Sequence, residues 1–247
     1  DGRGAMPRIL FLDDAIVVVD KPSGMPSVPA RNPHDPPDVA RVLEAGDWSG
    51  PRPEAVHRLD RDTSGILVLA RSRAARAALG RAFESGLVEK RYLAVVAGAP
   101  PAPAGVPHLP IGPDPGRPPA QRPSLVDGRP ATSRWKVVAA LEPDADGGRR
   151  SLVEVVPLTG RSHQIRVHLA WLGCPVHGDA LYGGPARSPA GRLWLHAAGI
   201  VFPDPRDGSR RAFAAPLCLA SSSRAVVPDA HLPAGVGRRA ESRTACQ

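Results

Sequence analysis

Short runs of β-branched and other apolar residues recur along the chain, separated by glycine, proline and charged residues. Runs of this length, bounded by turn residues, are typical of β-strands. We therefore expect strands at residues 9–12, 16–20, 66–70, 91–97, 135–140, 152–156 and 193–202.

Two segments show the periodicity of helices instead. Residues 73–85 carry apolar side chains on one face, with Ser72 suited to cap the first turn and Gly86 to end the helix. A second helix is expected over residues 161–172, ended by Gly173. Many strands with so few helices predict an α+β fold built on a mostly antiparallel sheet.

Proline changes the picture between residues 99 and 130, where eleven prolines occur. At that density we expect no regular element, only a long surface excursion between two parts of one sheet. Residues 221–247 are rich in Ser, Arg, Gly and Pro without periodicity, which predicts a disordered basic tail. The remaining residues 1–220 are long enough for one domain with a sizeable core.

Charge and cysteine content narrow the class of protein. The net charge is +8 and the isoelectric point is near 10.4, which favours a polyanionic partner, although an inert basic surface explains the charge equally well. No apolar run is long enough to span a bilayer, and no secretory signal is visible. The three cysteines are widely spaced and suggest neither a disulfide framework nor a zinc ribbon, so we expect a cytoplasmic protein.

The densest polar cluster occupies residues 57–65, just before an apolar strand. A solvated turn explains it well, but loops that lead into rigid strands also hold catalytic groups. Asp60 and Asp62 suggest a glycosidase-like pair of carboxylates. His57, Asp60 and Ser64 suggest a hydrolase triad, although no GxSxG turn is present. A single carboxylate acting at a ribose carbon is the third option, and the residues alone leave all three open.

A second cluster, residues 159–169, opens the second expected helix. His163 and His168 are five positions apart, which is poor spacing for metal ligands, so no metal site is expected. Helical spacing puts Arg166 beside Ile165 and Leu169, at the border of the core-facing side. A partly buried arginine needs an anionic partner, and the carboxylate of Asp60 would satisfy it.

A third cluster, residues 89–96, contains Tyr92, which would share one face of a strand with Lys90 and Ala94. The commoner explanation of such a tyrosine is a core aromatic ring with its hydroxyl group at the surface.

Together these clusters resemble the motifs of the RluA family of pseudouridine synthases. Residues 57–65 match the pattern HRLDxxTSG, residues 90–92 match KxY, and residues 160–169 match GRxHQIRxHL. Order and spacing agree from about Ile9 to Pro216. The other matching segments are KPSG at the start of residues 21–25, GDxxYG at residues 178–183, and the closing residues 195–197 and 213–216.

The resemblance implies a fold and an activity. The fold is a mixed, largely antiparallel sheet in two halves, with flanking helices and an active site in a basic cleft between the halves. The activity is the isomerisation of uridine to pseudouridine in tRNA anticodon stem-loops, large-subunit ribosomal RNA, or both, without a cofactor or metal. The short N-terminal segment predicts the compact type without an S4 domain. A monomer is expected. An inactive RNA-binding or RNA-chaperone protein and an RNA glycosidase are the alternatives.

The same resemblance implies roles for individual residues. Asp60 is the catalytic carboxylate, held ionised by Arg166, and attacks C1′ or removes a proton from C2′. Tyr92 stacks on the uracil and assists proton loss at C5. Arg58 fills the gap that the flipped uridine leaves. The remaining residues expected at the substrate are the walls Ile165 and Leu169, which exclude water, and the polar residues His57, Arg61, Thr63 and Arg161.

Overall fold

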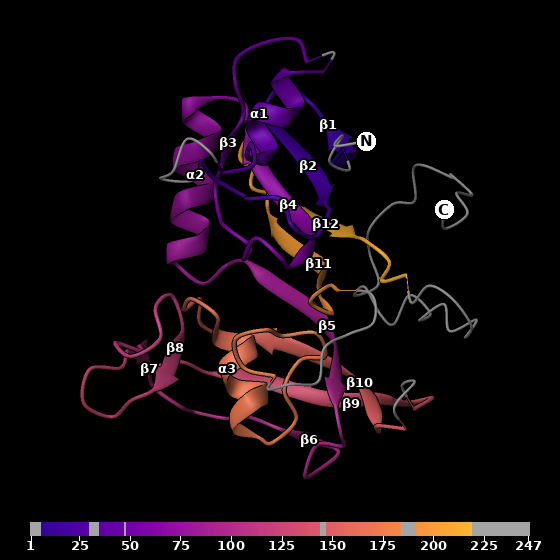
Figure 1. Ribbon diagram of the computed structural model, residues 1–247. Coiled ribbons are helices and arrows are strands. Elements are labelled where there is room, and N and C mark those ends of the chain that lie inside the picture. Colours follow the sequence, from indigo (N-terminus) through magenta and orange to yellow (C-terminus); the bar gives the residue numbers. More distant parts are fainter. Residues whose placement is uncertain (1–5, 30–34, 47, 144–146, 184–190, 219–247) are drawn as a thin grey trace.

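A sheet of ten strands runs through the whole molecule in the computed structural model, which describes residues 6–29, 35–46, 48–143, 147–183 and 191–218 (Figure 1). The order of the strands along the sheet is β1-β2-β4-β11-β5-β10-β9-β6, with β12 paired to β11 and β3 to β4. Their bounds are β1 Arg8–Leu12, β2 Ile16–Lys21, β3 Glu54–Ala55, β4 Ser64–Ala70, β5 Glu89–Ala97, β6 Ala104–Gly105, β9 Ser133–Leu141, β10 Arg150–Pro157, β11 Leu195–Pro203 and β12 Arg210–Ala214.

The sheet is antiparallel except at one place, where β4 and β11 run parallel. Two residue pairs form this contact, His196 with Ser64 and Ala197 with Gly65. Gly65 has φ +108°, and a Cβ atom there would lie 2.6 Å from the backbone nitrogen of Ala197. Only glycine permits so close an approach of two backbones. The mixed, largely antiparallel sheet that the sequence predicts is therefore confirmed.

In the first half of the molecule, β2 and β4 are buried on both faces. Residues Ile16 and Val18 pack with helix α2, Arg73–Glu84, whereas Val17 and Val19 pack with helix α1, Val39–Glu44. Successive residues of a strand face opposite sides, so two covering helices require apolar residues at every position. This explains why the sequence shows continuous apolar runs here rather than alternation.

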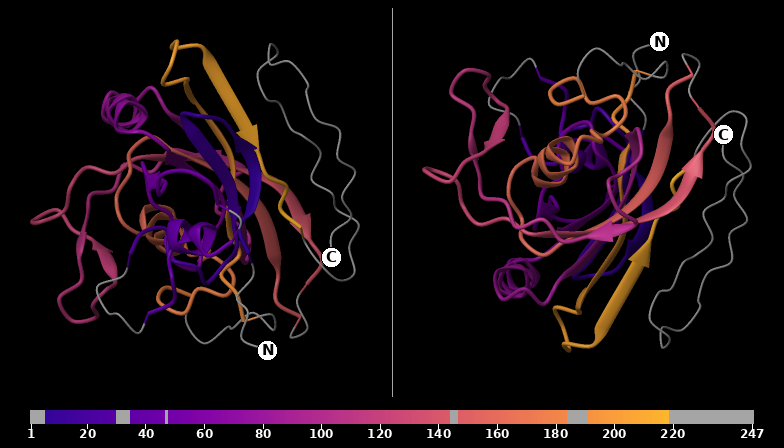
Figure 2. Two further views of the ribbon diagram at one scale, coloured as in Figure 1. Left: turned by 90° about the horizontal axis from the view of Figure 1, so that it is seen from above. Right: turned by 90° about the horizontal axis from the view of Figure 1, so that it is seen from below.

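The second half consists of β6, β9 and β10 with helix α3, Gln164–Trp171. Ile165 and Leu169 of α3 pack against Val153 and Val155 of β10 in one core cluster. Strands β5 and β11 connect the two halves, as Figure 1 shows. A separate hairpin of β7, Ile111–Pro113, and β8, Gln121–Pro123, projects to one side (Figure 2).

The helices confirm part of the prediction and correct the rest. Helix α2 begins after Ser72, whose hydroxyl accepts a hydrogen bond from the amide of Ala75 at 3.1 Å, as expected for a cap. Helix α3 begins at Gln164, not at residue 161, because the Gln164 side chain binds the amide of Arg161 at 3.0 Å and holds the preceding residues in a turn. Helix α1 was not predicted, since it has only six residues and follows a proline-rich segment.

The proline-rich stretch departs from the prediction of no regular element, because β6, β7 and β8 lie within residues 99–130. Each has only two or three residues, and prolines are tolerated in such short strands where no ladder hydrogen bond is lost. Cys218 is disulfide-bonded, which the cysteine spacing did not predict. In the described part of the chain, no helix is long and apolar enough to cross a membrane. The expected tail, residues 221–247, lies outside the described residues.

Candidate active site

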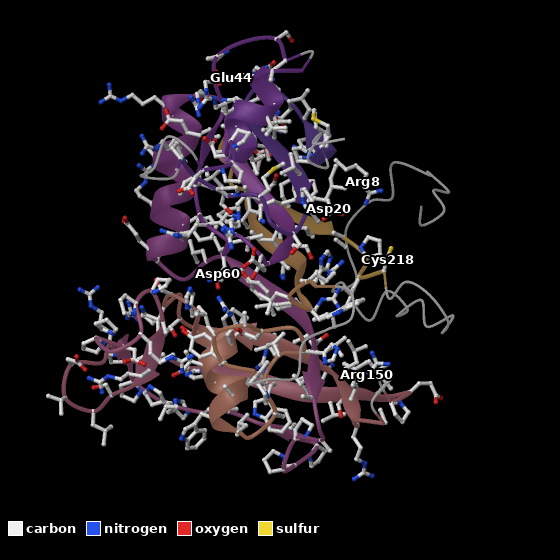
Figure 3. The ribbon with its side chains drawn as sticks, in the orientation of Figure 1. Arg8, Asp20, Glu44, Asp60, Arg150 and Cys218 are labelled. Atoms are coloured by element: carbon white, nitrogen blue, oxygen red, sulfur yellow. The ribbon has the colours of Figure 1, made fainter. Side chains whose placement is uncertain are left out.

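A cavity of about 300 Å³ lies between the two halves, where the loop before β4, the start of β5 and the start of α3 meet. Figure 3 shows Asp60 at this junction. Eight of the ten residues singled out from the sequence line the cavity: His57, Arg58, Asp60, Thr63, Tyr92, Arg161, Ile165 and Arg166.

The carboxylate of Asp60 forms an ion pair with Arg166, which lies 106 positions away in the sequence. Nη1 of Arg166 donates to Oδ2 of Asp60 at 3.1 Å. The side chain of Arg166 is only 8% exposed, whereas that of Asp60 is 23% exposed and open to the cavity. The pairing expected from the half-buried position of Arg166 is therefore present.

Arg166 is itself held by a second carboxylate, that of Asp179. Nε and Nη2 of Arg166 donate to the two oxygens of Asp179 at 2.7 and 2.8 Å, and the Asp179 side chain is fully buried. Burial opposes the charged form of Arg166, but the bonds to Asp179 and the charge of Asp60 outweigh it and raise its pKa. The sequence motif contained Asp179, but sequence reasoning gave it no role.

His163 stands beside this pair in a left-handed conformation, with φ 55°. Its Nε2 lies 3.9 Å from Oδ2 of Asp60, and its Nδ1 is 2.7 Å from the hydroxyl of Tyr182. Burial lowers the pKa of His163, although the charge of Asp60 opposes the shift, so the ring is neutral at neutral pH. A neutral ring whose Nδ1 accepts from Tyr182 carries its proton on Nε2, facing Asp60.

Tyr92 of β5 forms another wall of the cavity and packs against core clusters of both halves. No described residue forms a hydrogen bond with the hydroxyl group of Tyr92. Burial, and then the negative charge of Asp60, raise the pKa of Tyr92. The phenol is therefore protonated at neutral pH and can donate a hydrogen bond into the cavity.

Two of the expected residues lie elsewhere. Leu169 is 1% exposed and belongs to the core behind the cavity, because it lies one turn further along α3 than Ile165. The guanidinium of Arg61 pairs with Asp62 at 3.1 Å, and Arg61 lines a separate depression. Neither Leu169 nor Arg61 lines the cavity, and their expected contacts with the substrate stay predictions.

His57 lines the cavity as an uncharged wall. Its ring stacks on Phe83 with centroids 5.0 Å apart, and its Nε2 accepts a hydrogen bond from the amide of Val68 at 3.1 Å. Burial, with a smaller effect of Lys90, lowers the pKa of His57 to about 3. A neutral His57 fixes the loop to β4 and brings no positive charge to the site.

Lys21 holds the loop before β4 in place, and sequence reasoning gave this lysine no such role. Its ammonium is buried and donates to the carbonyl oxygens of Pro22, Met25 and Arg61 at 2.8–2.9 Å. Burial lowers the pKa of Lys21 to about 8, although the charges of Asp62 and Asp60 oppose this. The three bonds use all three ammonium protons and fix the backbone next to Asp60.

The geometry bears on each of the mechanisms that the sequence left open. Asp62 pairs with Arg61 and is absent from the cavity lining, so no second carboxylate faces Asp60 there. The hydroxyl of Ser64 is bound to Nδ1 of His196 at 2.9 Å, away from His57, so the proposed triad is not assembled. What remains is one carboxylate, oriented by a guanidinium and facing an aromatic ring.

Comparisons with known proteins agree with this site. A model of the RNA pseudouridylate synthase family matches residues 15–171. The dual-specificity RNA pseudouridine synthase RluA of Escherichia coli K12 is 41% identical over 209 residues, covering 84% of this chain and 92% of that protein. The RluA of Vibrio vulnificus is 40% identical over 201 residues, covering 81% and 78%. The structure of human RNA pseudouridylate synthase domain containing 1 has a TM-score of 0.70 and 26% identity, covering 87% and 86%.

Fold, site and family model together define an RNA pseudouridine synthase, an enzyme that isomerises uridine within RNA. Within that class, the identity to RluA proteins over most of both chains shows that this chain belongs to the RluA family.

Proposed function

We propose that the protein converts specific uridines of structured RNA to pseudouridine with Asp60 as the catalytic carboxylate. The observation that carries this assignment is the ion pair of Asp60 and Arg166 at the mouth of a cavity that also holds Tyr92. A protein that only binds RNA has no need for a carboxylate oriented by a buried guanidinium, which favours the enzyme over an inactive RNA chaperone.

The reaction breaks the N1–C1′ bond, turns the uracil, and joins C5 to C1′. N1 gains a proton and C5 loses one, so atoms and electrons balance without an external reactant. Asp60 either attacks C1′ or removes a proton from C2′, and both routes begin from an ionised carboxylate. Arg166 holds that carboxylate in place for the ribose through a charge-assisted hydrogen bond.

Tyr92, Thr63 and Ile165 would enclose the flipped uracil. The raised pKa of Tyr92 suits a ring that stacks on the base and donates a hydrogen bond more than one that accepts the C5 proton. Extruding the uridine costs a few kcal/mol of unstacking. Arg58 is exposed and lines the cavity. We propose that its side chain fills the space that the flipped uridine leaves in the RNA.

The substrates we propose are tRNA anticodon stem-loops and large-subunit ribosomal RNA. Relatives named dual-specificity RNA pseudouridine synthases support action on more than one RNA, and the net charge of +8 favours a polyanion. We further propose that the enzyme acts in the cytoplasm as a monomer, with residues 1–220 as one catalytic domain.

Replacing Asp60 by Asn tests the assignment, because Asn has the same shape but cannot be ionised. We expect Asp60→Asn to fold normally and to lose roughly 10³-fold or more of its activity. The measurement is tritium release from RNA labelled at uridine C5. Asp62→Asn is the matched control, since that carboxylate pairs with Arg61 outside the cavity, and it should remain active.

Retained tritium release in Asp60→Asn would remove Asp60 from the mechanism. Free uracil in the wild-type reaction would instead identify an RNA glycosidase, because isomerisation leaves the mass of the RNA unchanged.

A further inference from the structure

A second cavity, of about 620 Å³, adjoins the catalytic one. The two share the wall residues Phe83, Lys90, Pro157, Thr159 and Gly160. The second cavity extends from this wall along the end of α2 and across β5 to residues 199–201 of β11. It is about twice as large as the catalytic cavity, and the reaction described above does not use it.

Lys90 belongs to the wall that the two cavities share. It is partly buried, yet its ammonium forms no hydrogen bond or ion pair with any residue that the structure describes. Its neighbour Arg91 pairs with Glu154 at 3.4 Å, and Lys136, another of the three lysines, pairs with Glu154 at 3.1 Å. Lys90 is thus a cation at a cavity wall that has no counter-charge among the described residues.

Such a position is unfavourable without an anion from outside. Burial lowers the pKa of Lys90, and no neighbouring carboxylate offsets that effect. A cation taken partly out of water regains stability when a negative charge reaches it. The enzyme places one uridine of a polyanionic chain in the adjoining cavity, so the phosphates next to that uridine are the nearest source of an anion.

The other charges around the second cavity are compatible with RNA. Glu89 is paired with Arg210 at 2.9 Å, and Arg134 is exposed without a partner among the described residues. Glu84, exposed at the end of α2, is the one lining carboxylate with no cationic partner in the described chain. A Cβ atom at Gly160 would lie 3.9 Å from Nζ of Lys90, in van der Waals contact with the ammonium. Because glycine has no side chain, this side of the ammonium stays open to a backbone phosphate.

We propose that Lys90 binds one of the two phosphates that flank the flipped uridine, and that the second cavity receives the adjoining nucleotide. The site deepens the proposed function and rests on it, because it requires an RNA chain with one nucleotide in the catalytic cavity. Lys90 contacts the backbone, so it contributes affinity without reading the base sequence.

The first test measures the binding of unfractionated tRNA by the full chain at several salt concentrations. Lys90→Met should weaken binding about tenfold and lower the slope of log K against log salt by about 0.7 to 0.9. Lys90→Arg should restore most of the affinity, because it keeps the charge. Lys136→Met removes the same charge from an exposed, ion-paired lysine and should bind within about twofold of the wild type.

The second test uses the stem-loop that carries the modified uridine, with a single uncharged methylphosphonate on either side of it. One of the two linkages should cost the wild type about as much affinity as Lys90→Met does. Combining that linkage with Lys90→Met should cost nothing further. This arm uses the wild-type fold, so a wild type that is indifferent to both linkages overturns the proposal even if Lys90→Met does not fold.

Several outcomes overturn the proposal. Unchanged tRNA affinity and salt slope in a folded Lys90→Met do so, and so does a wild type that is indifferent to both methylphosphonates. In these cases the wild type still forms pseudouridine, so the proposed function stands. If the wild type forms no pseudouridine while Lys90→Met binds tRNA weakly, the proposed function fails instead.

Discussion

Arg166 divides its hydrogen bonds between two carboxylates with different tasks. The side formed by Nε and Nη2 is fixed on buried Asp179, and Nη1 alone reaches Asp60. The guanidinium is planar and rigid, so fixing one side of it sets the direction of the remaining N–H. Asp179 also accepts hydrogen bonds from the backbone amides of Leu181 and Tyr182. We infer that Asp179 positions the catalytic carboxylate through Arg166 without touching the substrate.

Asp179→Asn should therefore slow the chemical step more than it weakens RNA binding. Asn keeps one oxygen for the amides of Leu181 and Tyr182 but loses the charge and the second acceptor for Arg166. We expect kcat to fall about 10- to 100-fold with KM nearly unchanged, measured by tritium release at saturating and subsaturating RNA. Asp207→Asn, which alters an exposed turn, is the control. An unchanged kcat in a stably folded Asp179→Asn would show that Arg166 needs no such support.

Strand β11 connects the two halves and therefore controls the site between them. It pairs with β5 over six residue pairs but with β4 over only two, one of which includes Gly65. The catalytic loop lies directly before β4, and the cavity wall continues at Leu195 of β11. The position of Asp60 relative to β5 and α3 thus depends on a close contact of two backbones.

Gly65→Ala tests that dependence. The added methyl group would clash with the backbone of Ala197, and φ +108° at Gly65 is strained for any other residue. We therefore expect the free energy of unfolding to fall by about 3 kcal/mol or more. Gly80→Ala is the matched control, because Gly80 lies in α2 and an added Cβ there has nothing within 4 Å. The free energy of unfolding of Gly80→Ala should rise by up to about 1 kcal/mol. Urea unfolding measures both, and equal stability of the two variants would contradict this view of β4 and β11.

The local parts of the molecule were predictable, whereas of the long-range side-chain contacts only the pair of Asp60 and Arg166 was expected from the sequence. The extent of α2 follows from its one-sided apolar pattern and the Ser72 cap, and both are properties of adjacent residues. The start of α3 depends on bonds from Gln164 to Thr132 and Ser133, more than thirty positions upstream. The helical spacing of Arg166 predicted that it would lie beside Asp60. The bond from Arg166 to Asp179 was not predicted, because Asp179 lies in a loop whose sequence has no periodicity.

Neutral histidines that are buried or partly buried occur in both halves of the described molecule. His57 precedes β4, His163 and His168 belong to the start and middle of α3, and His196 lies in β11. Burial is the main cause that lowers the pKa of each, to about 3 for His57 and about 4 for His196, from an ordinary value of 6.5. Each ring forms a hydrogen bond that its neutral form permits: His57 accepts from the amide of Val68, and His196 donates to the carbonyl oxygen of Ala215, while His163 bonds to Tyr182 and His168 to Ser133.

These histidines make the fold sensitive to mild acid. Between pH 6.5 and about 4 the unfolded chain binds protons at His57 and His196 while the folded protein does not, so their contribution to stability is full above pH 6.5 and falls as the pH decreases. His57→Gln keeps an acceptor for the amide of Val68 but cannot titrate. The free energy of unfolding of His57→Gln, measured in urea, should fall with acidification less steeply than that of the wild type. The difference between the two slopes should correspond to about one proton bound on unfolding. Parallel pH dependences of the two proteins from pH 7.5 to 4.5 would mean that His57 is protonated in the folded state and does not serve as the neutral wall of the site.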